Sequence, residues 1–330
     1  MIDKIHHVIK GCFLSVLALI LIVACSGKSP HNITAQDHIS PSSVTRIVEH
    51  TMGKTIVPAS PQRIVTINPL FLGNALALGI KPTGSTGWQL DDSSNLSAYE
   101  AYLQRLPGEF TYLGLVTQPS LEKILSVKPD LIVGFDSSKP IYGQLSQIAP
   151  TLLFSWSGTA QSWKETLLAF GEAIGKSQEA NEALEAYYQR TQEFKQNMGE
   201  KAAQTQVSLI ELDSNNTISL IPKDVFAGSI LEDAGLSRPS SQNWTRGYQI
   251  ISLEQLPQID GDVIFIRTSG DNDQERAQLV KQLQSHVLWS QLNAVRQGKV
   301  YQIDPYYWFN SSIIDANLVL DDLSKYILEE

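Results

Sequence analysis

The chain has 330 residues, with 34 acidic and 25 basic side chains, and a formal net charge of −9 at neutral pH. An acidic surface disfavours nucleic acid and anionic lipid headgroups, so nucleic acid is excluded as a partner. The length is sufficient for a large core, and chains of this size often divide into two units. No repeat of fixed period is visible in the sequence.

The beginning of the chain has the features of an export signal. A short basic start precedes an apolar run, Cys12–Val23, that is shorter than the roughly 20 residues of a membrane span. The ending Ile-Val-Ala-Cys resembles a bacterial lipobox, which implies cleavage after residue 24 and lipid on Cys25; an uncleaved anchor helix is the alternative. We therefore predict a lipoprotein signal peptide over residues 1–24 and an exported protein, in the periplasm or at the cell surface, anchored to the membrane through Cys25.

The residues after the predicted signal form a polar segment. Residues 25–43 contain Pro, Ser and Gly without apolar periodicity and predict a lipidated cysteine followed by a flexible tether. Two short β-rich runs, 44–50 and 54–58, then predict a hairpin at the start of the globular part. No disulfide is expected, because Cys12 lies in the signal and Cys25 carries the lipid.

Beyond the hairpin, short β-branched runs alternate with helical segments. Strands separated by helices favour a parallel sheet with covered faces, and this pattern predicts a first α/β lobe over residues 44–160. Its expected strands are Arg63–Ile67, Pro82–Ser85, Asp130–Gly134 and Thr151–Phe154. Its expected helices are Leu70–Leu78, Ser120–Ser126 and Ile141–Ile148.

The longest helical pattern of the chain follows this lobe. We predict a backbone helix over residues 161–199, interrupted at Gly171 and Gly175. The alternation then resumes and predicts a second α/β lobe over residues 200–330. Its expected strands are Gln206–Leu212, Thr217–Ile221, Val263–Ile266 and Val300–Ile303. Its expected helices are Ala227–Ala234, Leu253–Gln258, Asp273–Leu283 and Ile313–Leu328.

Several segments together carry a resemblance to a known family. They include Arg63-Ile-Val-Thr-Ile, Asn74-Ala-Leu-Ala-Leu-Gly-Ile-Lys-Pro-Thr-Gly, Lys128-Pro-Asp-Leu-Ile-Val-Gly, Gly228-Ser-Ile-Leu-Glu-Asp-Ala-Gly-Leu and the ending that starts at Gly298-Lys-Val-Tyr. In this order they resemble the iron–siderophore substrate-binding lipoproteins of ABC importers, the periplasmic binding proteins with a helical backbone. The resemblance runs from about residue 44 to residue 328.

The resemblance implies an α/β fold of two Rossmann-like lobes, joined by a single long backbone helix, with a ligand cleft between them. It implies a monomeric receptor rather than an enzyme, with no permanent cofactor, that carries a ferric siderophore as its transported ligand. Its partners would be an ABC permease and the ATPase of that permease. Related receptors often use a glutamate on the first helix of each lobe for docking, whereas this chain has Gly73 and Ser229 there. Glu232 and Asp233 lie one turn beyond Ser229, and Glu100 or Glu109 could serve the first lobe.

A ferric chelate needs cations for its anionic groups and aromatic faces for its rings and aliphatic arms. Open α/β sheets bind ligands at the carboxyl ends of their strands. The Trp, Tyr and Arg residues predicted there as ligand-binding are Trp88, Trp156, Trp244, Arg246, Arg267, Tyr306 and Tyr307. Each has a structural alternative: the aromatic residues could cover loops or pack in the core, as expected for Trp308, and Arg267 could pair with Asp271 or Asp273. Hydroxamate, catecholate and mixed citrate chelates all fit these residue types.

The same residues bear on other possible functions. A receptor for haem or cobalamin is the alternative in the same class, although haem usually takes an axial His or Tyr. A siderophore-processing hydrolase is the enzyme alternative, but no G-x-S-x-G motif and no catalytic residues are found. A receptor for a free metal ion is excluded, because the histidines outside the signal, His31, His38, His50 and His286, do not cluster.

Overall fold

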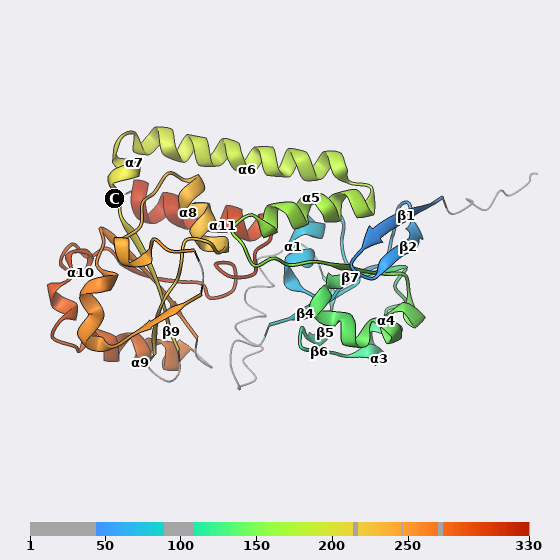
Figure 1. Cartoon of the computed structure of the whole chain (residues 1–330), viewed down its shortest axis with the longest axis horizontal. Helices are drawn as coiled ribbons and strands as arrows, with labels where there is room; N and C mark the ends of the chain where they lie inside the picture. The colour runs from blue at the N-terminus through green and yellow to red at the C-terminus, as the bar shows by residue number, and fades with distance from the viewer. Residues whose placement is uncertain (1–43, 89–108, 214–216, 246, 270–272, 330) are drawn as a thin grey trace, which may run out of the picture. The chain divides into compact units, whose positions relative to one another are not determined.

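The computed structural model describes residues 44–88, 109–213, 217–245, 247–269 and 273–329. The chain divides into two compact units, Met1–Ser42 and Ser43–Glu330, and all described residues belong to the second. That unit contains two α/β lobes and the helices between them (Figure 1). The predicted signal, Cys25 and the tether lie outside the described residues.

A small hairpin begins the second unit, as the sequence predicts. Strands β1 (Thr45–His50) and β2 (Gly53–Pro58) pair antiparallel, with Ile47 opposite Ile56 and His50 opposite Gly53. Gly53 has a φ of +110°, which a residue with a Cβ rarely adopts, so glycine is needed where the chain turns back.

The first lobe is built on a six-stranded sheet of order β6-β5-β4-β3-β7-β8. All neighbours in it are parallel except the short edge strand β6. Its strands are β3 (Ile64–Thr66), β4 (Gly84–Gly87), β5 (Thr111–Leu115), β6 (Gln118–Pro119), β7 (Leu131–Phe135) and β8 (Thr151–Phe154). Its helices are α1 (Pro69–Ala77), α3 (Leu121–Ser126), the 3-10 helix η1 (Asp136–Ile141) and α4 (Tyr142–Ile148).

The second lobe has a five-stranded mixed sheet of order β11-β10-β9-β12-β13. The pairs of β12 with β9 and β13 are parallel, and the two pairs of β10 are antiparallel. Its strands are β9 (Val207–Leu212), β10 (Ile218–Leu220), β11 (Gln249–Ile251), β12 (Val263–Thr268) and β13 (Val300–Ile303). Its helices are α7 (Lys201–Gln204), α8 (Phe226–Asp233), η2 (Ser240–Gln242), η3 (Leu253–Ile259), α9 (Asp273–Gln284), η4 (Trp289–Gln291), α10 (Asn293–Arg296), α11 (Ile313–Leu323) and the π-helix η5 (Ser324–Leu328).

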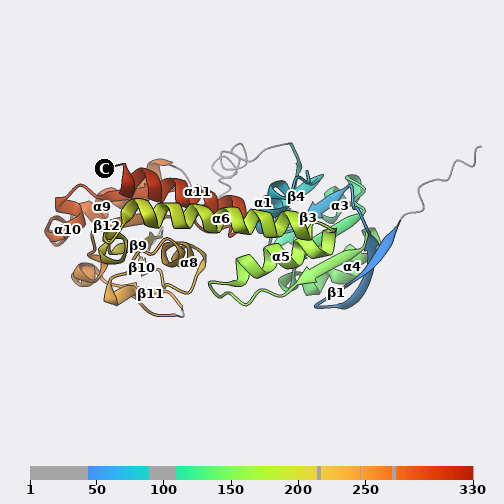
Figure 2. The same ribbon diagram turned by 90° about the horizontal axis from the view of Figure 1, so that it is seen from above.

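The segment predicted as one backbone helix is two helices, α5 (Ser162–Ile174) and α6 (Ser177–Met198). Gly175 ends α5 with a left-handed φ of +75°, as the sequence predicts. The predicted interruption at Gly171 is wrong: a Cβ there would lie 2.5 Å from the Cβ of Ala180, so this glycine allows α5 and α6 to pack closely. The 22-residue α6 alone runs alongside both lobes (Figures 1 and 2).

The largest hydrophobic core is continuous between the lobes. It joins side chains of α1, α5, α6, α8 and α11, such as Phe71, Trp163, Tyr187, Ile230 and Val319. Two smaller cores cover the opposite faces of the sheets, one in each lobe. The lobes therefore share buried apolar surface in addition to the chain connection.

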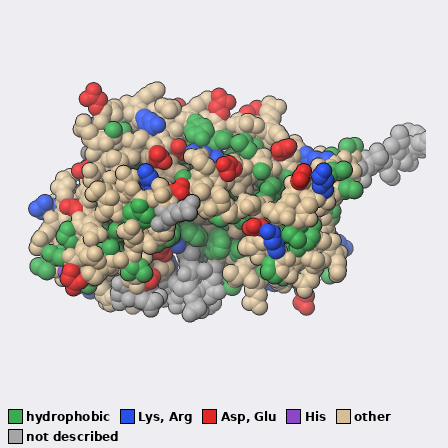
Figure 3. Space-filling model, in the orientation of Figure 1, with side chains coloured by type: hydrophobic (Ala, Val, Ile, Leu, Met, Phe, Trp, Pro, Cys, Tyr) green, Lys and Arg blue, Asp and Glu red, His purple; other side chains and the backbone are tan. Residues whose placement is uncertain are grey.

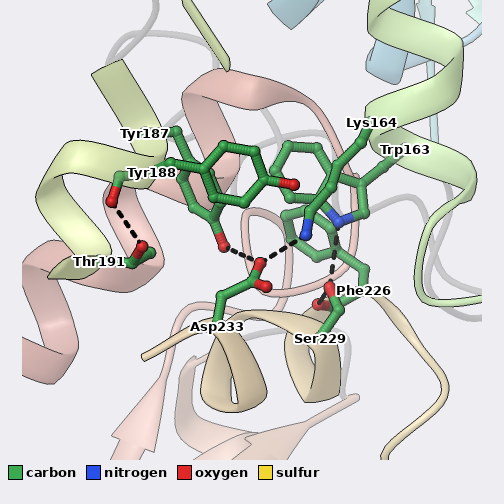
Figure 4. A network of polar contacts seen from close by, with 8 residues as sticks. All are labelled: Trp163, Lys164, Tyr187, Tyr188, Thr191, Phe226, Ser229 and Asp233. Atoms are coloured by element: carbon green, nitrogen blue, oxygen red, sulfur yellow. Dashed lines mark hydrogen bonds and ion pairs between the residues drawn. The ribbon is translucent and has the colours of Figure 1, made fainter. Parts of the chain in front are cut away.

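A buried polar network joins α5, α6 and α8 (Figure 4). The ammonium group of Lys164, whose side chain is 6% exposed, lies 2.6 Å from a carboxylate oxygen of Asp233. Tyr187 donates a 2.7 Å hydrogen bond to the same carboxylate oxygen, and the indole N–H of Trp163 donates to Ser229. Desolvation, reinforced by the Asp233 carboxylate, raises the pKa of Tyr187, which keeps its hydroxyl a donor.

A second junction lies between α1 of the first lobe and the start of α11. The backbone N–H of Ile313 donates to the buried side-chain oxygen of Asn74 at 3.0 Å. Ser312 caps α11 and forms a capping box with Asp315. A Cβ on Gly73 would lie 2.1 Å from the Ser312 hydroxyl oxygen, so only glycine allows this approach.

Candidate functional site

A cavity of about 350 Å³ lies between the two lobes. Its first-lobe wall includes residues at or after the carboxyl ends of β4, β7 and β8, namely Trp88, Phe135 and Trp156. Its second-lobe wall includes Arg267 near the end of β12 and Ile303 at the end of β13. Because parallel strands end at one edge of a sheet, both lobes present their loops to the same space.

Aromatic side chains form much of this wall. In the first lobe, the ring of Phe135 lies 5.1 Å from Trp156 and 4.7 Å from Phe71, which connects the wall to the core. Trp88 meets Phe309 of the second lobe edge to face, with ring centres 5.8 Å apart. Trp88 and Trp156 are both half-buried, so part of each ring is free to contact a ligand.

Arg267 supplies the cation that faces the cavity. In β12 it is on the same face as Phe265, which packs in the shared core, but it lies next to the last residue of the strand, where the cavity begins. The residue is 6% exposed, and its guanidinium lies 4.5 Å from the ring centre of Phe309. One Nη donates at 3.4 Å to Glu211, its neighbour on β9.

The other predicted ligand residues lie elsewhere. Trp244 donates its indole N–H to the carbonyl of Gly247 and packs against the second-lobe core. Tyr306 and Tyr307 are 4% and 6% exposed, and the Tyr307 hydroxyl donates to Asp322. None of these three lines the cavity. Arg246 lies outside the described residues, as does Asp271, one of the alternative partners of Arg267.

Several cavity residues are absent from the sequence prediction. Trp308, expected only in the core, also lines the cavity, and Asn68, Tyr248, Phe309 and Asn310 join it. The capping box Ser312-x-x-Asp315 could have located Asn310 and Phe309, because it fixes the start of α11 directly after them. Desolvation raises the pKa of the Tyr248 hydroxyl, although 44% of the residue is exposed.

Within the described residues there is no group of three His, Cys, Asp or Glu side chains that could hold a metal ion. No helix in the described part of the chain is both long and apolar enough to cross a membrane. On the face shown in Figure 3, described acidic and basic side chains are interspersed rather than gathered by sign.

Comparison with known proteins identifies the family of the chain. The family model for periplasmic binding proteins matches residues 65–307. The "Probable siderophore-binding lipoprotein YfiY" of Bacillus subtilis strain 168 is 31% identical over 97% of this chain and 98% of its own length. The Fe(3+)-citrate-binding protein YfmC of the same organism is 29% identical, with 88% of each chain covered.

Among solved structures, the chain is similar to Staphylococcus aureus SirA complexed with staphyloferrin B. The two superpose with a TM-score of 0.69 and 25% identity, over 86% of this chain and 98% of that one. The matched proteins are binding proteins, and the similarity to SirA includes the two-lobed α/β architecture. The chain therefore belongs to the periplasmic binding protein family.

Proposed function

We propose that the chain is an exported, lipid-anchored receptor that binds a ferric siderophore in the cavity between its lobes and delivers it to an ABC importer. The cavity carries the proposal: Trp88, Trp156 and Arg267, predicted from the sequence for this ligand, all line it. Aromatic faces suit the arms of an iron chelate, and a guanidinium suits its oxygen atoms. The similarity to siderophore-binding and ferric-citrate-binding proteins supports the same ligand type.

Titration of tryptophan fluorescence with iron-loaded and iron-free siderophores, haem and cobalamin tests this function. Saturable quenching at submicromolar concentration by a ferric siderophore is the expected result, because Trp88, Trp156 and Trp308 line the cavity. Trp88→Ala should weaken binding by about 10-fold, the value of one stacked aromatic contact. Trp244→Ala is the matched control, since Trp244 lies outside the cavity wall. Binding of haem or cobalamin alone would refute the proposed ligand.

The proposed anchor is lipid on Cys25. Mass spectrometry of the protein from membranes should show a diacyl or triacyl modification at this residue, and Cys25→Ala should release the protein from the membrane fraction. Membrane retention of Cys25→Ala would instead favour an uncleaved helix.

Docking to the permease is proposed to use contacts other than the usual two glutamates. Gly73 is buried against Ser312, and Ser229 is 2% exposed and bonded to Trp163, so neither position can present a carboxylate to a partner. Asp233 is occupied by Lys164, whereas Glu232 on the same helix is exposed. Glu232→Ala should therefore reduce uptake while leaving ligand affinity unchanged.

A further inference from the structure

Three residues of the cavity wall have buried polar atoms without a hydrogen-bond partner. They are the indole N–H of Trp88, the Nε of Arg267, and both the oxygen and the nitrogen of the Asn310 side-chain amide. Asn310 is only 3% exposed. Buried polar groups are hydrogen-bonded in most native proteins. Buried atoms without a partner also occur outside the cavity, at Arg46, Asn74 and Arg238, but those of the wall belong to residues that line a space where a ligand can supply the partners.

The Asn310 amide is informative about that ligand. Its nitrogen donates and its oxygen accepts, so a matching group must offer both an acceptor and a donor. A secondary amide has both, and a hydroxamate oxygen accepts well. Iron-bound hydroxamate, catecholate and carboxylate groups all present only acceptors, so the donor for the Asn310 oxygen must come from an amide unit of the chelate.

The charges around the cavity also restrict the ligand. Arg267 is the cation among the described residues of the wall, and Glu211 already pairs with it. A groove that continues the cavity past Arg267 is lined by Glu211 and Asp213. Asp136, on the other side, adds a carboxylate that pairs with the half-exposed Lys139. The described wall thus has no surplus of positive charge for a polyanion.

We infer that the cargo is a ferric chelate of low net charge, held by hydroxamate groups and carrying amide units, rather than a polyanionic catecholate or dicitrate complex. The inference rests on the proposed function and adds the substrate class. Three monoanionic hydroxamates neutralise Fe³⁺, whereas three dianionic catecholates leave three negative charges. A neutral chelate meets the Trp88, Arg267 and Asn310 donors without unbalanced charge beside Glu211.

Dissociation constants for a panel of chelates of known charge test the inference. The full chain is titrated with ferrioxamine E and ferrichrome, both neutral, and with ferric dicitrate and ferric enterobactin, both polyanionic. We expect the better neutral chelate to bind at least about 100-fold more tightly than either polyanion. Tighter binding of a polyanion overturns the substrate class and leaves the proposed function intact. Absence of binding by every ferric chelate overturns both.

Two variants test the mechanism. Glu211→Gln frees Arg267 and removes a negative charge, so affinity for the polyanions should rise about 10-fold relative to the neutral chelates. Glu232→Gln removes the same charge from an exposed position outside the cavity and is the matched control. Asn310→Leu should weaken binding of the neutral chelate about 10-fold. Equal effects of Glu211→Gln and Glu232→Gln, or unchanged neutral-chelate affinity in Asn310→Leu, would overturn the inference.

Discussion

Two polar clusters lie between the lobes, and they use the same kinds of residue for different ends. The network of α5, α6 and α8 combines a tryptophan, a tyrosine, a cation and a carboxylate, in Trp163, Tyr187, Lys164 and Asp233 (Figure 4). The cavity wall combines tryptophans with Arg267 and its neighbour Glu211.

The clusters differ in how well their hydrogen bonds are satisfied. In the network, the ion pair is 2.6 Å long, and among the described atoms no buried side-chain nitrogen or oxygen of these four residues lacks a partner. In the cavity, the ion pair is 3.4 Å long and Trp88, Arg267 and Asn310 each keep an unpaired buried atom. Residue type alone therefore does not distinguish these two clusters, whereas hydrogen-bond satisfaction does.

The largest expected effect comes from breaking the satisfied network. Asp233→Leu leaves the Lys164 ammonium buried without its partner, and we expect the free energy of unfolding to fall by about 3–5 kcal/mol. Urea unfolding measures this, and chelate affinity measured where the variant is folded should change less than twofold.

The double variant Lys164→Met/Asp233→Leu is the control, because replacing both charges by apolar side chains should recover most of the loss. A single variant as stable as the wild type would show that the network does not hold the lobes together.

A smaller loss is expected at the junction of α1 and α11. Alanine at Gly73 would place its Cβ 2.1 Å from the Ser312 hydroxyl oxygen, so α11 must move; we expect a loss of about 1–3 kcal/mol. Because Ser311 and Asn310 precede Ser312 in the cavity wall, affinity should fall as well.

Calorimetry and chelate titration of Gly73→Ala measure both effects together. Ser312→Gly added to Gly73→Ala removes the clash and should restore part of the stability, since Gly replaces Ser at a cap at a cost of a few tenths of a kcal/mol. Wild-type stability of the single variant would contradict the close packing.

Removing the unsatisfied Asn310 amide should have the opposite effect and increase the free energy of unfolding. In the absence of ligand, Asn310→Leu should raise the free energy of unfolding by about 1–2 kcal/mol, because a buried amide without partners is replaced by an apolar side chain. Asn74→Leu is the contrasting control: the Asn74 nitrogen also lacks a partner, but its oxygen accepts from the Ile313 N–H, so the loss of that acceptor should destabilise. Destabilisation by both variants would mean that the Asn310 amide makes stabilising hydrogen bonds in the absence of ligand.

The sequence predicts the regular parts of the fold well, because their patterns are local. Thr151–Phe154 and Val300–Ile303 have the predicted bounds, and the stop at Gly175 follows from its missing side chain. The sequence does not predict strands β5, β6 and β11. Strand β5 contains Gly114 and β6 ends in Pro119, and neither residue favours a strand. These strands exist through pairing with neighbours.

The site is less predictable, since burial and satisfaction depend on distant contacts. The position of Trp88, Trp156 and Arg267 after predicted strands identifies them as ligand residues, and they line the cavity. Position after a strand also predicts Tyr307 as a ligand residue, but its hydroxyl donates a hydrogen bond to Asp322 on α11, 15 residues later in the chain. Asn310 carries no sequence signal of its own, because only the fold shows that both of its amide atoms are buried and unpaired.

The smallest expected effect concerns a group that is satisfied in one protonation state only. The Nδ1 of His50 accepts a hydrogen bond from the N–H of Leu153, and its Nε2 bonds to Thr55. Desolvation lowers the pKa of His50 below its ordinary value of 6.5. The unfolded chain therefore binds a proton more readily, so the stabilisation is complete above pH 6.5 and is lost as pH falls through the folded pKa. Urea unfolding should show a free energy of unfolding that is lower at about pH 5 than at about pH 7.5, by less than about 1 kcal/mol. This loss should be absent in His50→Gln. An equal loss in both proteins would exclude His50 as its source.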